Sequence, residues 1–157
     1  MSNNSLKKIA VAVTIIVALS LVLFVWQVQR TVEGPVPIAW DRDVCAHCRM
    51  HISDRRFAAQ VQSNNAEVFN FDDPGCLFEH LVKQNIEAQA TYFRAYQEDR
   101  WLTKTSIAFI KVDSSPMGYG PAAVKRGSAG SMPYSEANAM VLNKQHQPMH
   151  FGDKDAP

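Results

Sequence analysis

An uninterrupted apolar run near the N-terminus constrains this chain more than any other feature. Residues 9–29 carry no charge and are mostly apolar, and roughly twenty such residues are enough to cross a bilayer as a helix. Lys7 and Lys8 precede the run, and Trp26 lies near its far end. Lysines favour the cytoplasmic side of a membrane and aromatic residues favour its interface, so we expect residues 1–8 in the cytoplasm and the chain after Arg30 on the other side.

A cleaved signal peptide is the alternative for this run. The run is longer than the apolar region of a typical signal peptide, and residues 27–30 lack a small-x-small cleavage site. No cysteine directly follows it, which disfavours a lipoprotein anchor. We therefore expect an uncleaved single-pass anchor at residues 9–29 in the cytoplasmic (inner) membrane, with the soluble part in the periplasm or another extracytoplasmic space.

The chain after the anchor is short. Residues 30–39 contain Gly34, Pro35 and Pro37, which is typical of a linker. Residues 40–157 are enough for one small domain or two half-sized lobes. The net charge of +1 gives no indication of a nucleic-acid partner.

The segment from Asp43 to His51 concentrates metal-binding side chains: two thiols, a thioether and two imidazoles. Cys45 and Cys48 are separated by two residues and can close on one metal ion, and Met50 can add a thioether. These soft donors suit Cu(I) and exclude hard cations such as Mg²⁺. A C-x-x-C pair alone also occurs in zinc sites and redox dithiols.

The pattern after this segment predicts an α+β fold. Residues 57–62 alternate as in a half-buried strand, residues 67–71 resume the alternation, and Asp72-Asp73-Pro74 is typical of a helix start with carboxylate caps. Residues 91–96, 107–112 and 122–125 are further expected strands, and 133–145 an expected helix. We expect two similar strand-strand-helix lobes, roughly 40–90 and 91–157.

Cys76 is expected in the first turn of the first helix, with His80 four residues later on the same face. A lone cysteine there is commonly a small buried apolar residue. The alternative joins Cys45, Cys48, Cys76 and His80 in a structural zinc module. With three cysteines in the chain, either Cys45 and Cys48 form a disulfide and leave Cys76 free, or a metal keeps all three reduced.

Three segments together resemble the NosL family, accessory proteins of nitrous oxide reductase. They are Cys45-Ala46-His47-Cys48-Arg49-Met50, Phe71-Asp72-Asp73-Pro74-Gly75-Cys76 and Pro116-Met117-Gly118-Tyr119-Gly120. The resemblance covers nearly the whole exported part. It implies a copper chaperone outside the cytoplasmic membrane that binds one Cu(I), supplies nitrous oxide reductase, and has two lobes of strand-strand-helix topology. NosL proteins are typically lipoproteins, whereas a transmembrane helix takes that role here, so the acceptor is nitrous oxide reductase or another copper enzyme.

Carried over to this chain, the resemblance implies that the Cu(I) ligands come from Cys45, Cys48, Met50 and Met117. A membrane transport complex of the same maturation system is a further expected partner. Copper transfer between proteins catalyses no reaction, so the chain is not expected to be an enzyme. His47 and His51 are expected at the surface or behind the ligands, with one of them replacing Cys48 as the alternative.

A thiol–disulfide oxidoreductase is the competing function, because Cys45-Ala46-His47-Cys48 has the form of a redox dithiol. Such enzymes place the first cysteine at a helix N-terminus after a strand. Here residues 41–43 are polar, and residues 49–56 lack an apolar stripe. A c-type haem is excluded because Arg49 stands where histidine is required.

Overall fold

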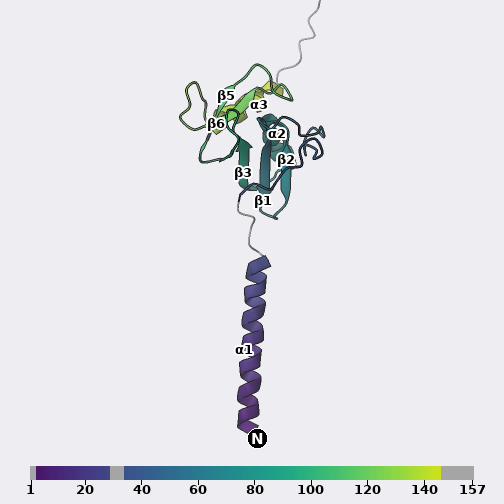
Figure 1. The fold of residues 1–157 in the computed structure, drawn as a ribbon, viewed down its shortest axis with the longest axis vertical. Coiled ribbons are helices and arrows are strands. Elements are labelled where there is room, and N and C mark those ends of the chain that lie inside the picture. The colour runs from purple at the N-terminus through teal and green to yellow at the C-terminus, as the bar shows by residue number, and fades with distance from the viewer. Residues whose placement is uncertain (1–2, 29–33, 146–157) are drawn as a thin grey trace, which may run out of the picture. The chain divides into compact units, whose positions relative to one another are not determined.

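The computed structural model describes residues 3–28 and 34–145, and the chain divides into two parts between residues 33 and 34. The N-terminal part contains the helix α1 (Asn3–Val28) (Figure 1). Its section Lys7–Gln27 is long and apolar enough to cross a membrane, by length and composition. A signal sequence near an N-terminus meets the same criterion, so the helix is a candidate for either role.

The part from Gly34 onward is a domain that combines two antiparallel sheets with two helices (Figure 1). A four-stranded sheet has the order β2-β1-β3-β4, formed by β1 (Ala59–Ser63), β2 (Val68–Phe71), β3 (Ala88–Arg94) and β4 (Trp101–Thr103). A two-stranded sheet pairs β5 (Ile107–Lys111) with β6 (Pro121–Lys125). The helices are α2 (Pro74–Gln84) and α3 (Tyr134–Gln145). The predicted α+β class is confirmed.

Two strand-strand-helix units follow one another along this domain: the first unit is β1-β2-α2, and the second unit is β5-β6-α3. Between them, β3 pairs with β1 and β4 pairs with β3, so both extend the first sheet. The expected boundary between lobes at residue 90 therefore falls inside β3. The strand β4 was not predicted, because three residues are too short to show an alternating pattern.

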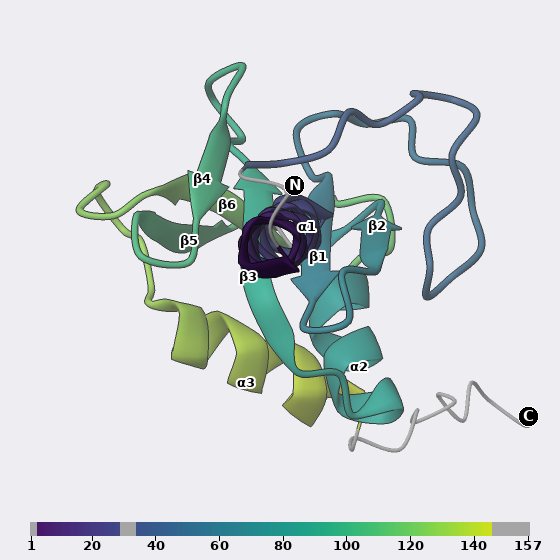
Figure 2. The ribbon, with the colours of Figure 1, turned by 90° about the horizontal axis from the view of Figure 1, so that it is seen from below.

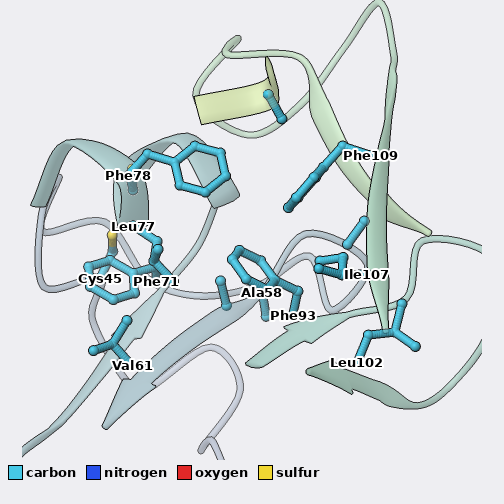
Figure 3. Packing of buried hydrophobic residues seen from close by; sticks show 14 of the residues in the cluster. Cys45, Ala58, Val61, Phe71, Leu77, Phe78, Phe93, Leu102, Ile107 and Phe109 are labelled. Carbon is cyan, nitrogen blue, oxygen red and sulfur yellow. The ribbon is translucent and has the colours of Figure 1, made fainter. Parts of the chain in front are cut away.

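The helix α2 joins the two units through the apolar core. It contacts β1 and β2 of the first unit and β6 and α3 of the second, and Figure 2 shows α2 and α3 next to each other. The ring of Phe78 on α2 packs edge-on against Phe109 at a centroid distance of 5.6 Å and against Tyr134 at 5.1 Å. Phe93 from β3 completes this group, 5.3 Å from Phe109 (Figure 3). Burying such rings is the main stabilising contribution that small domains have.

The strand β1 differs from the half-buried strand that its alternation predicts, because all five of its residues are buried. The polar side chains of Gln60 and Gln62 face a segment that precedes the cysteine-containing segment from Asp43 to His51. Gln60 Nε2 donates to the carbonyl of Val36 at 2.9 Å, and Gln60 Oε1 accepts from the amide of Val36 at 2.7 Å. Gln62 Nε2 donates to the carbonyl of Gly34 at 2.7 Å. The chain from Gly34 onward therefore belongs to the folded domain.

Candidate metal centre

Three cysteine side chains from two separate segments meet beside the core. The sulfur atoms of Cys45, Cys48 and Cys76 all lie within 4.8 Å of one another. Cys45 and Cys76 are fully buried, whereas Cys48 is partly exposed. Figure 3 shows Cys45 beside Phe71 and Leu77. A group of thiols at this spacing can close on a single metal ion.

The loop that carries Cys45 and Cys48 is fixed by its own backbone. The amide of Cys45 donates to the carbonyl of Met50 at 2.8 Å, and the amide of Arg49 donates to the carbonyl of Cys45 at 3.0 Å. Arg49 has a positive φ of 67°, which turns the chain back on itself. The amide of Ala46 donates to the carbonyl of Asn70 at 2.9 Å and so attaches the loop to β2. Hydrogen bonds of the backbone therefore hold the loop in this shape.

The start of α2 fixes the third cysteine. Asp73 is the N-cap, and its Oδ1 accepts from the amide of Gly75 at 2.8 Å. Pro74 occupies the first helical position, as predicted, so Cys76 lies in the first turn. The assignment of Asp72 as a second cap was wrong, because its Oδ1 instead accepts from the amide of Ser53 at 3.4 Å. Burial raises the pKa of Asp72 to about 6.

Hydrogen bonding among the thiols shifts their pKa values in opposite directions. The hydrogen bond with Cys76 lowers the pKa of Cys45 to about 4, and backbone amides including that of Asp72 act in the same direction. The same contact raises the pKa of Cys76, and burial raises the pKa of Cys48. Cys45 is therefore the thiol whose pKa is shifted downward, in contrast to its two neighbours. Metals bind the thiolate form, so a bound metal would displace the remaining thiol protons.

The two methionines predicted as ligands occupy different surroundings. The side chain of Met50 is 52% exposed at the end of the cysteine loop. Met117 is partly buried against the core, and its amide donates to Oδ2 of Asp73 at 3.2 Å. The hydroxyl of Ser115 also hydrogen-bonds the Asp73 carboxylate, so this loop of the second unit lies at the N-terminus of α2. Ligation by either thioether stays a prediction.

The glycine in the Pro74-Gly75-Cys76 segment is required by a close approach. A Cβ placed on Gly75 would lie 2.1 Å from Cγ of Tyr119. The ring of Tyr119, two residues after Met117, therefore rests directly on the first turn of α2. This contact and the hydrogen bonds of Asp73 hold the segment from Ser115 to Tyr119 against the helix that carries Cys76.

Two imidazoles lie near the thiols, yet neither belongs to the group within 4.8 Å. His47 Nε2 lies 2.9 Å from Oε2 of Glu79, a buried carboxylate on α2. The ring of His80 packs on Phe69 at 5.4 Å and on Phe71 at 5.2 Å, and burial lowers its pKa. Of the four residues of the alternative zinc site, the structure therefore gathers the three cysteines and leaves His80 outside.

Sequence reasoning placed His47 at the surface or behind the ligands and gave no role to Glu79. A carboxylate at position 79 is flanked by the apolar and aromatic residues of a helix face, and it lies three residues after Cys76. A charged residue in that position is the signal that could have identified it. His51 is exposed, as expected, and its backbone forms an isolated bridge with Val44.

These observations define an α+β domain whose buried thiols form a candidate metal site. A scan against protein-family models finds no match, and neither does a search of curated proteins. Among solved structures, the crystal structure of the copper chaperone NosL from Shewanella denitrificans is distantly similar. The similarity covers 71% of this chain and 89% of that chain, with 16% sequence identity and a TM-score of 0.47.

Proposed function

We propose that this chain is a membrane-tethered, periplasmic Cu(I) chaperone that delivers copper to nitrous oxide reductase or a related copper enzyme. The observation that carries the proposal is the group of three thiols within 4.8 Å of one another, with no carboxylate among them in the described part of the chain. Thiolates select soft metals such as Cu(I), and Cu(I) accepts low coordination numbers. The motifs that resemble NosL contain all three cysteines.

The expected Cu(I) ligands are Cys45, Cys48, Met50 and Met117, and the geometry adds Cys76 as a fifth candidate. Two buried sulfurs would keep Cu(I) away from water and oxygen. Cys48 is partly exposed and Met50 is exposed. An incoming ligand of the acceptor can therefore replace these outer sulfurs first, so the metal passes by ligand exchange and no reaction is catalysed.

Delivery outside the cytoplasm requires the domain to be held there. The apolar section of α1 supports an uncleaved anchor with the lysines on the cytoplasmic side, and the domain from Gly34 onward would then face the periplasm. The expected partners are the copper-accepting enzyme and a membrane transport complex of the same maturation system.

The experiment is an anaerobic titration of the reduced full-length chain in detergent with Cu(I), against a competing chelator. One tightly bound Cu(I) is expected. Cys45→Ser should abolish tight binding because it removes a fully buried sulfur of the group, and Met117→Ala should weaken it. Met140→Ala on α3 is the control and should leave binding unchanged. A reduced protein that binds no Cu(I) would refute the proposal.

A structural zinc module is the second candidate, because the same three thiols suit zinc. Its mark would be Zn²⁺ in the isolated protein and loss of folded structure when the metal is chelated. The thiol–disulfide oxidoreductase gains no support from the described structure, since Cys45 lies in a turn that follows no strand and begins no helix.

A further inference from the structure

A histidine–carboxylate contact links the same two segments that carry the three thiols. His47 stands between Cys45 and Cys48 in the loop, and Glu79 follows Cys76 by one helical turn on α2. His47 Nε2 and Glu79 Oε2 are 2.9 Å apart, and their side chains are 17% and 5% exposed. The pair therefore fixes the direction of the imidazole that is nearest to the thiols in sequence.

The burial of the Glu79 carboxylate costs free energy. Glu79 Oε1 is buried and has no partner at hydrogen-bond distance within residues 3–28 and 34–145, although the Tyr119 hydroxyl lies close enough to the Glu79 carboxylate for this contact to help raise the pKa of Tyr119. A buried carboxylate oxygen without a hydrogen bond is costly. A carboxylate kept under these conditions points to a role in the site beside it.

The role follows from the number of donors that each metal needs. A structural zinc site takes four ligands in a tetrahedron, and three thiols and one imidazole are a common set. Here the three thiols are in place, and His47 and His80 are the imidazoles beside them. Neither belongs to the group, because Glu79 holds His47 and the rings of Phe69 and Phe71 enclose His80. The thiols are left as a site of three soft donors, which Cu(I) accepts and zinc completes poorly.

We infer that Glu79 is a specificity-determining residue: by holding His47 away from Cys45, Cys48 and Cys76, it denies zinc a fourth protein ligand. The inference rests on the proposed function, since discrimination against zinc matters for a chain that carries Cu(I). Glu79 does not touch the metal and acts through His47.

The opposite arrangement is the obvious rival. A histidine that ligates a metal commonly donates its other ring nitrogen to a carboxylate, so Glu79 would then orient His47 as a ligand. The geometry does not favour this rival, because the atoms that come within 4.8 Å of one another are the three sulfurs, without a nitrogen of His47. The two arrangements predict changes of opposite sign.

The test is a set of Zn²⁺ and Co²⁺ titrations of the reduced full-length chain and its variants. Glu79→Ala frees His47 and should raise zinc affinity about tenfold or more, the scale on which such outer contacts act. Glu79→Gln can still accept a hydrogen bond from the imidazole and should change little. In the His47→Ala/Glu79→Ala double variant the gain should disappear, and His47→Ala alone should bind zinc as the parent chain does. Glu136→Ala, an exposed carboxylate on α3, is the matched control.

The absorption spectrum of bound Co²⁺ supplies a readout that a merely structural role would not move. It should change from a three-sulfur pattern to a three-sulfur, one-nitrogen pattern in Glu79→Ala. Circular dichroism checks that each variant folds, and Glu79→Leu, which fills the same volume, replaces the alanine variant if that one does not fold.

A loss of zinc affinity in both His47→Ala and Glu79→Ala would overturn the inference and make His47 a ligand. Unchanged zinc affinity in folded Glu79→Ala would overturn it as well. The parallel Cu(I) titration separates the two proposals. A parent chain without Cu(I) binding refutes the proposed function, whereas the zinc comparison reports on Glu79 in either case.

Discussion

The two strand-strand-helix units have the same order of elements and differ in what they bury. Every buried polar or charged side chain of the described chain lies between residues 60 and 91: Gln60, Gln62, Ser63, Asp72, Asp73, Glu79, His80 and Thr91. Among residues 107–144, the buried residues of the unit formed by β5, β6 and α3 are all apolar or glycine. Burying polar groups costs free energy unless they are hydrogen-bonded. Seven of these residues lie within the first unit and Thr91 lies on β3, so the first unit holds most of the buried polar groups, and the second supplies apolar packing and one loop.

The two helices show the same contrast. The first seven residues of α2, from Pro74 to His80, are all buried, including a carboxylate and an imidazole. In α3 the buried residues are Ala137 and Val141, four positions apart, which form a single narrow stripe. A repeated topology has thus been used for two purposes: α2 organises polar contacts on several sides, and α3 covers one face of the core.

The largest difference between the two units in the loss of unfolding free energy is expected for substitutions at the starts of α2 and α3. Asp73→Ala removes the cap of α2 and leaves the amides of Gly75 and Met117 without their acceptor. Loss of a cap costs about 1 kcal/mol, and a buried unpaired amide adds about 1–3 kcal/mol. The free energy of unfolding should therefore fall by about 3 kcal/mol, as measured by urea denaturation.

The matched variant is Ser135→Ala in the first turn of α3, where the side chain is exposed. It should change the free energy of unfolding by no more than about 0.5 kcal/mol. Equal losses in the two variants would show that the polar cost is shared by both units. Asp73→Ala should also weaken Cu(I) binding through the Met117 loop, which Ser135→Ala should not.

A smaller effect is expected where the second unit touches the first. Gly75→Ala places a methyl group 2.1 Å from the ring of Tyr119, and overpacking of this kind costs about 1–3 kcal/mol. Removing the ring should relieve the strain, so Gly75→Ala should be nearly neutral in a Tyr119→Ala background. Unfolding free energies of the four proteins in this double-mutant cycle measure the coupling. Additive effects would contradict the contact.

The sequence indicated those parts of the molecule that depend on local pattern. The alternation in residues 57–62 and 67–71, the Asp73-Pro74 start of α2 and the strands near 107 and 122 each depend on neighbours within a few positions. Cys45 and Cys48 are also close in sequence, so their candidacy as a metal pair required no knowledge of the fold. The α+β class followed from these local features alone.

The remainder depended on contacts between distant residues. The burial of Gln60 results from hydrogen bonds to Val36, twenty-four positions earlier, and an alternating pattern cannot show what covers the polar face of a strand. The joining of Cys76 to Cys45 depends on how the loop docks on α2. Glu79 was missed for the same reason, because its partner His47 lies on the other segment of the site.

The smallest effect concerns the second unit and depends on pH. Partial burial of its side chain raises the pKa of Tyr134 to about 12, so the folded state holds this proton more tightly than the unfolded state does, where the pKa is about 10. The stabilising contribution is complete below pH 10 and is lost as the pH rises through 12. Tyr134→Phe has no proton to lose, so the free energy of unfolding should fall less steeply between these values, by about 2 kcal/mol at most. At neutral pH this ionisation should contribute no difference. Urea denaturation at a series of alkaline pH values measures the effect, with phenolate absorbance as a direct titration. Parallel loss of stability in both proteins would show that Tyr134 titrates as an exposed tyrosine, and the apolar burial attributed to the second unit would then be overstated.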